Sequence, residues 1–345
     1  MSQFKVDSIT NRDGSYGPQI CGITTFAGSG ITLPSGSTEM RGGRGRGITG
    51  GGFVSPSSQN VMDFITFASK GDAQDFGDLT VILRNIATCA SSTRGTFASG
   101  QSPSNSDVIM YTTISSLGGC NDFGNLSSVM TNSNEGCTSD NTRGIILYGS
   151  PSSLPTNANQ GTLDFITIAT TGSSNRFGEL SVARRHTGTM ASPTRGVFVT
   201  GKNDTTSTYL KLIDFVIIQT QGTAVKFGEI SGGGREQSVG AGNATRGVIA
   251  GGLGSPTPYQ NIDFITLATE GNGQDFGDLS ANRFGMSSMS NSVRATFAGG
   301  STPSNTNGIE FVTIATAGDA TDFGDLTVAR TVGQGLSDAH GGLAQ

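Results

Sequence analysis

Residues 63–79 read DFITFASKGDAQDFGDL, and variants of this stretch occur in six copies along a chain of 345 residues. Thirteen residues always separate the residue that opens the stretch from the Phe of a Phe-Gly pair. The openings are Asp63, Met110, Asp164, Asp214, Asp263 and Glu310, and the pairs begin at Phe76, Phe123, Phe177, Phe227, Phe276 and Phe323. A spacing that never changes predicts a β-hairpin of fixed register, with its turn at residues such as Lys70-Gly71-Asp72.

A second signature, an Arg-Gly pair followed by a short apolar run, precedes each of these hairpins. Its arginines are Arg46, Arg94, Arg143, Arg195, Arg246 and Arg294, the last followed by Ala instead of Gly. A further short strand is expected before each Arg. Each period of 47 to 54 residues then holds four strands, which is the size of one propeller blade.

The strand patterns indicate blades that are buried on both faces. In Leu163–Ala169 apolar residues occupy both sides of the strand, whereas a sheet with one wet face would alternate. Helical 3.6-residue periodicity is absent. We therefore predict an all-β, six-bladed β-propeller of four-stranded blades over residues 41–345. The segment of about 329–345 is expected to complete the blade opened by residues 41–80, and a truncated seventh blade, marked by His340-Gly341-Gly342, is the alternative.

Composition narrows the function classes. The chain has 53 glycines, 14% charged residues and a net charge of −5, which favours many tight turns and gives no general attraction to nucleic acid. No apolar stretch is long enough for a membrane span and no signal peptide follows Met1, so neither membrane insertion nor ordinary export is expected. The four cysteines lack metal-binding spacing and are expected to be free, buried small residues.

The recurring Arg of the Arg-Gly signature needs a partner in each blade. We expect it to form ion pairs with the acidic or amide residue that follows each Phe-Gly pair. These residues are Asp78, Asn125, Glu179, Glu229, Asp278 and Asp325. The Arg residues are thus predicted to be structural.

The sequence offers little material for catalysis. His186 and His340 are the two histidines, and neither belongs to a triad pattern. The Asp-Phe-Gly triplets recur as repeat elements and therefore do not indicate a kinase. We predict no enzyme activity, no cofactor and no metal, and leave open a Ca²⁺ site in the turn at Asp72–Asp78.

Loops that vary between copies are the candidate binding residues. They lie between the Arg-Gly strand and the next hairpin, and variable loops on a rigid scaffold are where binding usually occurs. The candidates are Ser150, Asn157, Asn159, Asn203, Asp204 and Tyr209. The alternative is that these loops vary because nothing constrains them.

Residues 1–40 do not match the repeat and are predicted to form an extended docking arm. The apolar residues expected to dock are Phe4, Val6, Ile9, Ile23 and Phe26. Such an arm can add a strand to a neighbouring sheet. A disordered tail is the alternative.

Two resemblances add to this interpretation. Residues 41–345 resemble kelch repeats, with the double glycine at Gly51-Gly52, Gly251-Gly252 and Gly299-Gly300 but without the Trp of many kelch repeats. The start Phe4–Gly14, together with the repeats, resembles virion structural proteins of tailed phages, especially cyanophages.

The phage resemblance implies a virion component made in the host cytoplasm, serving as a tail, baseplate or decoration protein. Its implied partners are other virion proteins through the arm, with host-surface glycan or protein and a homo-oligomer left open. A kelch-type interaction adaptor and a propeller carbohydrate-active enzyme remain as alternative functions.

Overall fold

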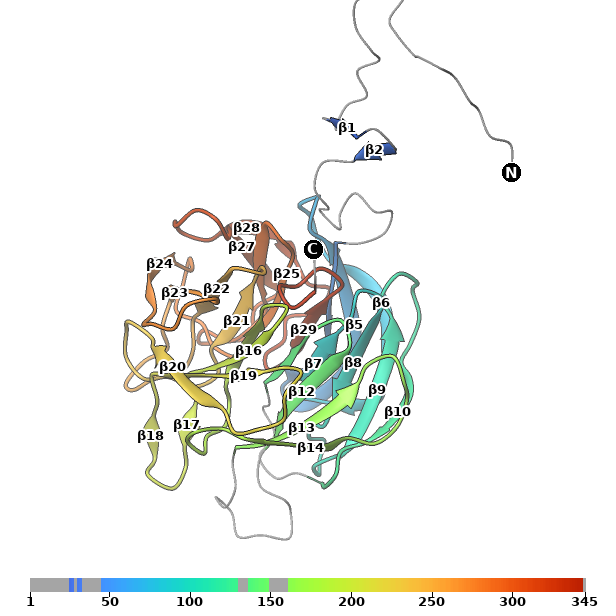
Figure 1. Cartoon of the computed structure of the whole chain (residues 1–345), viewed down its shortest axis with the longest axis horizontal. Helices are drawn as coiled ribbons and strands as arrows, with labels where there is room; N and C mark the ends of the chain where they lie inside the picture. Colours follow the sequence, from blue (N-terminus) through green and yellow to red (C-terminus); the bar gives the residue numbers. More distant parts are fainter. Residues whose placement is uncertain (1–24, 28–29, 33–44, 130–135, 149–160, 344–345) are drawn as a thin grey trace, which may run out of the picture.

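The computed structural model describes residues 25–27, 30–32, 45–129, 136–148 and 161–343. Within these ranges the protein is all-β, with six antiparallel blades that follow one another around a common centre (Figure 1). The six-bladed propeller predicted from the sequence is confirmed. No helix in the described part is long and apolar enough to cross a membrane.

Each blade has four main strands, which follow one another from the axis outward. The first blade contains β29 (Gln334–Ser337), β3 (Arg46–Gly50), β5 (Ser57–Thr66) and β6 (Gln74–Leu83), with β4 (Phe53–Val54) paired to β5. The second contains β7 (Ala87–Ala90), β8 (Arg94–Ala98), β9 (Val108–Thr113) and β10 (Asn121–Asn125). The third contains β11 (Cys137–Ser139), β12 (Arg143–Tyr148), β13 (Thr162–Thr167) and β14 (Asn175–Glu179).

The remaining blades repeat this order. The fourth contains β15 (Gly188–Ala191), β16 (Arg195–Val199), β19 (Leu212–Ile217) and β20 (Val225–Glu229), and its loop carries the small hairpin β17 (Lys202–Asn203) and β18 (Thr208–Tyr209). The fifth contains β21 (Val239–Gly242), β22 (Arg246–Ala250), β23 (Asn261–Thr266) and β24 (Gln274–Asp278). The sixth contains β25 (Ser287–Ser290), β26 (Arg294–Ala298), β27 (Gly308–Thr313) and β28 (Thr321–Asp325).

The first blade joins the two ends of the ring, because its innermost strand β29 pairs with β3. Asp338 supports this junction: its Oδ1 accepts hydrogen bonds from the backbone N–H groups of Gly45 and Arg46, at 2.8 and 2.9 Å. In the sixth blade Asn291 makes the same contacts within a continuous turn, to Val293 and Arg294. Asp338 thus rebuilds across the chain break the turn that other blades form covalently.

A short hairpin lies in the arm region, formed by β1 (Thr25–Ala27) and β2 (Gly30–Thr32). Phe26, one of the five predicted docking residues, belongs to β1. The other four, Phe4, Val6, Ile9 and Ile23, lie outside the described residues.

Every outer hairpin contains a β-bulge at the Phe of its Phe-Gly pair. In the first blade Met62 pairs with Gly77 and Asp63 with Asp75, so Phe76 is the extra residue. The Phe-Gly pair therefore lies inside the outermost strand, whereas the repeat pattern alone predicts that strand after the pair. The bulge turns each Phe inward, where it is at most 4% exposed and meets an aromatic ring of the adjacent strand edge-on at 5.8 to 6.3 Å.

The glycine of the same pair allows two blades to touch backbone to backbone. The turn of the next hairpin donates to this strand, as in Gly118 N–H to the Phe76 carbonyl at 2.9 Å and Cys120 N–H to the Asp78 carbonyl at 2.9 Å. A Cβ on Gly77 would lie 2.6 Å from the Gly118 backbone. All six junctions repeat these two bonds. The exposed outer edge of each sheet is thereby covered, which protects it from pairing with other chains.

The predicted ion pairs of the repeat Arg are wrong. Arg195 lies 4.6 Å over the ring of Phe215, and its Nη1 donates to the backbone carbonyl of Leu267 in the next blade at 3.0 Å. Arg46, Arg94, Arg143, Arg246 and Arg294 repeat this stacking on an aromatic ring and this donation to the next blade. The acidic residues after Phe-Gly are mostly exposed, and Glu179 and Glu229 pair instead with Arg176 and Lys226.

The ion pairs between blades involve other residues. A buried Arg after the Phe-Gly strand pairs with the acid that opens the next outer hairpin. The pairs are Arg184–Asp214 at 2.8 Å, Arg235–Asp263 at 2.6 Å, Arg330–Asp63 at 3.0 Å and Arg283–Glu310. Between the first and second blades the apolar Leu83 and Met110 take these positions in one core cluster. At the remaining junction the Arg position falls in 130–135, outside the described residues.

Candidate functional site

The propeller has two different faces. Residue 45 enters beside Asp338 on the side of the hairpin turns, which we call the entry face. The variable loops lie at the opposite strand ends, together with the links that join consecutive blades, and we call this the loop face. A chain segment attached before residue 45 therefore starts on the face opposite the variable loops.

The loops stand on a regular base. Lys202 N–H donates to the Arg185 carbonyl and Arg185 N–H to the Lys202 carbonyl, both at 3.0 Å, which ties the loop of the fourth blade to the preceding link. The same backbone bridge recurs as Phe53–Thr331, Arg84–Gln101, Glu236–Leu253 and Phe284–Ser301. The bases of these loops are consequently fixed by the scaffold.

A chain of turns surrounds the axis on the loop face. Asn85, His186, Gln237, Gly285 and Val332 occupy one equivalent position, all with φ between 50° and 63°. Each donates its N–H to the carbonyl of the preceding turn where both are described, as in Gln237 to His186 at 2.9 Å and Gly285 to Gln237 at 3.2 Å. His186 is therefore placed in this ring by a backbone constraint.

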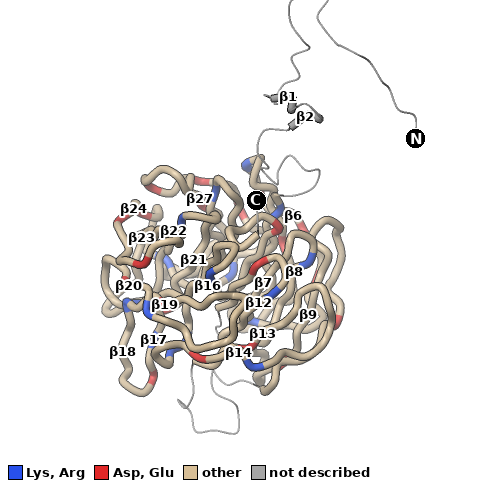
Figure 2. The backbone as a smooth tube through the Cα atoms, viewed as in Figure 1, with Lys and Arg blue, Asp and Glu red and all other residues tan. Residues whose placement is uncertain are grey.

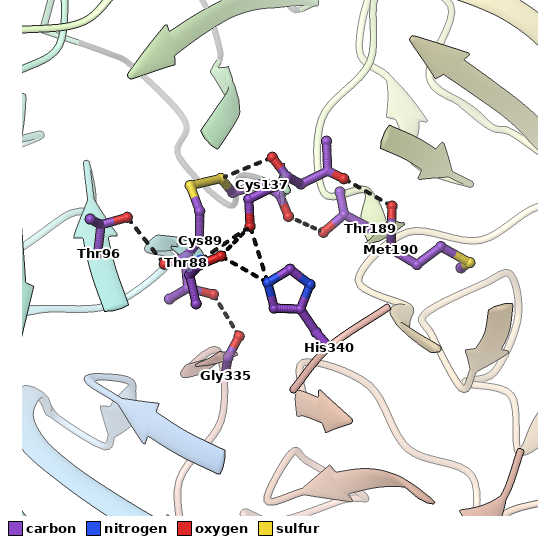
Figure 3. Close-up of a disulfide and its surroundings, with 11 residues drawn as sticks. Thr88, Cys89, Thr96, Cys137, Thr189, Met190, Gly335 and His340 are labelled. Atoms are coloured by element: carbon purple, nitrogen blue, oxygen red, sulfur yellow. Dashed lines mark hydrogen bonds between the residues drawn. A yellow bond between two sulfur atoms is a disulfide. The ribbon is translucent and has the colours of Figure 1, made fainter. Parts of the chain in front are cut away.

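The channel along the axis is narrow. The innermost strands are rich in Gly, Ala, Ser and Thr, and they line a cavity of about 70 Å³. Hydroxyl groups connect neighbouring strands, as in Thr88 to the Gly335 carbonyl at 2.6 Å and Thr189 to the Cys137 carbonyl at 2.7 Å (Figure 3). A cavity of this size has room for a few water molecules.

The C-terminal segment lies against the channel at the entry face. His340 donates from Nε2 to the Ala90 carbonyl at 2.8 Å, while its Nδ1 accepts from the N–H of Gly342 at 3.1 Å (Figure 3). Ala339 and Leu343 are buried. Burial lowers the pKa of His340, and hydrogen bonding to Ala90 opposes this only in part.

Cys89 and Cys137 form a disulfide between the innermost strands of the second and third blades, with Cα atoms 5.6 Å apart (Figure 3). The expectation of four free cysteines is therefore wrong for this pair. Cys120 is free, and burial raises the pKa of its thiol to about 12. Cys21 lies outside the described residues.

A charged cluster on the loop face has no counterpart in the other described blades. His186 Nδ1 lies 2.5 Å from Oε2 of Glu236, and both side chains are buried. Arg185 Nη1 lies 3.3 Å from Nε2 of His186, and its Nε lies 2.8 Å from Oδ2 of Asp204 in the variable loop. This geometry requires a neutral imidazole that donates from Nδ1 and accepts at Nε2.

The pKa values agree with that assignment. Burial lowers the pKa of His186, and Glu236 opposes the shift only in part. Burial acts to raise the pKa of Glu236, but the hydrogen bond and charge of His186 and the charge of Arg185 leave that pKa below its ordinary value. The cluster therefore holds a neutral histidine beside a carboxylate, and it anchors the loop through Asp204.

Two tyrosines flank the next link. A side chain at Gly233 would collide with the hydroxyl of Tyr259, and one at Gly234 would collide with the backbone of Tyr209. Lys202 Nζ lies 5.3 Å from the centre of the Tyr209 ring. This link, from Ser231 to Arg235, is one residue longer than its counterpart from Ser181 to Arg184.

Three of the six predicted loop residues belong to this part of the loop face. Asp204 pairs with Arg185, Tyr209 contacts the glycine link, and Asn203 caps its own turn through Thr206 N–H at 3.0 Å. Ser150, Asn157 and Asn159 lie outside the described residues. Sequence reasoning missed Arg185, Glu236 and Tyr259, although the extra glycine in this link was a detectable signal.

The described residues contain no group of three or more His, Cys, Asp or Glu side chains arranged to hold a metal ion, including the turn at Asp72–Asp78. Charged side chains of both signs are scattered over the view in Figure 2. No protein-family model matches the sequence, and the comparison with curated proteins finds no match.

Proposed function

We propose that this chain is a non-enzymatic virion structural protein, attached to the particle through its N-terminal segment and presenting the loop face to a partner. The observation that carries the proposal is the opposite placement of residue 45 and the variable loops. A segment docked on a particle would leave the propeller oriented with these loops outward. The resemblance of Phe4–Gly14 to phage virion proteins supports the same assignment.

The loop face supports a binding role better than a catalytic one. Its histidine is buried, neutral and held by Glu236 and Arg185, so the imidazole is not presented to a substrate. Asn203, Tyr209 and Tyr259 instead offer polar and aromatic groups of the kind enriched at recognition surfaces. The reciprocal backbone bridges fix the loop bases, which reduces the ordering cost of binding.

Labelling of purified particles tests the structural role. Gold-conjugated antibody against the propeller is expected to decorate intact particles at a fixed position. Particles without label, together with the protein free in the lysate, would contradict the proposal. An assay for glycan cleavage by the purified chain separates the carbohydrate-active enzyme, because the proposal predicts no cleavage.

The role of the loop face needs a second experiment with a matched control. The purified chain and a Tyr209→Ala, Tyr259→Ala variant are compared for binding to host cells. The proposal predicts weaker binding by the variant, with an unchanged melting temperature. The control is Leu117→Ala on the opposite end of a hairpin, where the side chain is 62% exposed and binding should not change.

A further inference from the structure

The outer hairpin of the fourth blade departs from the repeat at two exposed positions. Ile217 is 43% exposed and stands where the other five copies have Thr66, Thr113, Thr167, Thr266 and Thr313. Val225 is 57% exposed and stands where they have Gln74, Asn121, Asn175, Gln274 and Thr321. Because five blades fold with polar residues there, the fold does not require the two apolar ones.

The two residues form one apolar patch. Val225 pairs with Phe215 in the register of β19 and β20, and Ile217 lies two residues beyond Phe215 on the same face. Diagonal neighbours of this kind are within side-chain reach across a sheet. Exposed neighbouring apolar residues on a soluble chain indicate an interaction surface.

Charge on the outermost strands distinguishes the same blade. In four blades the residues before Phe and after Gly are acidic or amide: Asp75 and Asp78, Asp122 and Asn125, Asp275 and Asp278, Asp322 and Asp325. The fourth blade has Lys226 and Glu229, joined at 2.8 Å, and the third has Arg176 and Glu179, joined at 2.6 Å. All four of these side chains are largely exposed.

A strand carrying one base and one acid is complementary to a second copy of itself. In a two-fold contact Lys226 of one copy faces Glu229 of the other, and the reverse pair forms at the same time. The acidic strands of the other blades would repel one another in such a contact. Of the two self-complementary strands, only that of the fourth blade lies beside an apolar patch, because Thr167 and Asn175 occupy the matching positions in the third.

The contact must be made by side chains. The carbonyls of Phe227 and Glu229 on the outer edge of β20 already accept hydrogen bonds from Gly271 and Gly273 of the next blade, at 3.0 and 2.8 Å. Strand addition at this edge is therefore blocked. A second copy would instead cover Ile217 and Val225 and exchange the charged pairs around them.

We propose that the outer hairpin of the fourth blade is a homodimer interface, in which Ile217 and Val225 pack against their copies and Lys226 and Glu229 pair across the two-fold axis. This inference does not depend on the proposed function, because it concerns the purified chain in solution. It names a second copy of the chain as the partner.

Sedimentation velocity over a range of concentrations tests the proposal on the full chain. The unaltered protein is expected to shift from monomer to dimer as its concentration rises. The variant Ile217→Thr, Val225→Gln carries residues that other blades already accommodate, so it should fold. Its dimer dissociation constant should rise at least about tenfold, as expected when central apolar contacts are removed. A monomer at all concentrations, or an unchanged dimer in this variant, would overturn the proposal.

The control is Val293→Thr, which removes another exposed Val, 46% exposed, at a position where four other copies have Thr. It should leave dimerisation unchanged, and a comparable loss in this control would overturn the assignment of the surface.

A charge exchange gives an independent test. Lys226→Glu alone places like charges in the contact and should weaken the dimer. Combining Lys226→Glu with Glu229→Lys restores self-complementarity and should restore the dimer. Failure of the double exchange to recover association, in a protein with unchanged melting temperature, would overturn the charge pairing on which the choice of partner rests.

Discussion

Arg184 donates from Nη1 to Oδ2 of Asp214 at 2.8 Å, and both side chains are completely buried between the third and fourth blades. The same arrangement recurs at three further junctions, while Leu83 and Met110 replace it between the first and second blades. Burial lowers the pKa of Arg184, which reflects the cost of removing this charge from water. The protein therefore contains both a charged and an apolar solution to one packing problem.

We predict that Asp214→Ala destabilises the fold by about 3 to 5 kcal/mol, because it leaves Arg184 buried without its partner. The double variant Arg184→Leu, Asp214→Met copies the first junction and should recover most of this loss. Urea denaturation of the single and double variants measures both effects. Equal loss in the two variants would show that the apolar pair cannot replace the ion pair.

The glycine of each Arg-Gly pair is predicted to be required by the innermost strand of the preceding blade. A Cβ on Gly95 would lie 2.7 Å from Leu336 and one on Gly144 would lie 2.6 Å from Cys89, while Gly247 faces Met190. The exception supports this explanation, because Ala295 replaces the glycine where the facing residue is the small Ala241, in the same core cluster.

Gly247→Ala should accordingly cost about 1 to 3 kcal/mol through overpacking. Adding Met190→Ala should relieve the clash, so the coupling energy in a double-mutant cycle should be favourable. Thermal unfolding of the four proteins measures it. Strictly additive losses would argue against contact between these two positions.

Much of the ring could be predicted from the sequence, since the constant spacing of Asp63 and Phe76 and the two-faced apolar strands specify hairpins buried between blades. The partner of each Arg could not. Arg46 and Arg184 recur with similar regularity, and spacing alone does not tell which one reaches a carboxylate. The answer depends on how consecutive blades are rotated, which brings Asp214 to Arg184 and leaves Arg195 over Phe215.

The loop face was only partly predictable for the same reason. Loop variability identified Asn203, Asp204 and Tyr209. The link residues Arg185 and Glu236 approach Asp204 only through the ring of turns at the axis, and no local pattern in the sequence records that proximity.

Stability should fall as the pH drops below about 6.5. The pKa values of His186 and His340 are lowered in the folded state from an ordinary value of 6.5, so the unfolded chain binds these protons first. Each histidine can contribute a loss of up to about 1.4 kcal/mol per pH unit until its folded pKa is reached. Above this range the two groups have no effect.

Chemical denaturation at pH 7.5, 6.5 and 5.5 tests this dependence, with these conditions set by the ordinary histidine pKa of about 6.5. His186→Gln should flatten the decline relative to the unaltered protein. An equally steep decline in His186→Gln, His340→Gln would assign the effect to other groups.

The Cys89–Cys137 disulfide should stabilise the closed ring, because it joins the second and third blades over a separation of 48 residues. The chain-entropy model gives about 4 kcal/mol for a loop of this length. Non-reducing peptide mapping should find the linked pair, and reduction should lower the melting temperature. Cys89→Ser should match the reduced protein and show no further response to reductant; a continued response would point to a different pairing.

The orientation of the propeller on the particle tests the central claim most directly. A cryo-electron microscopy map of the intact virion should contain the six-bladed ring with Gly45 and Asp338 toward the particle and Tyr209 and Tyr259 toward solvent. A ring in the reverse orientation, or its absence from the particle, would contradict the account.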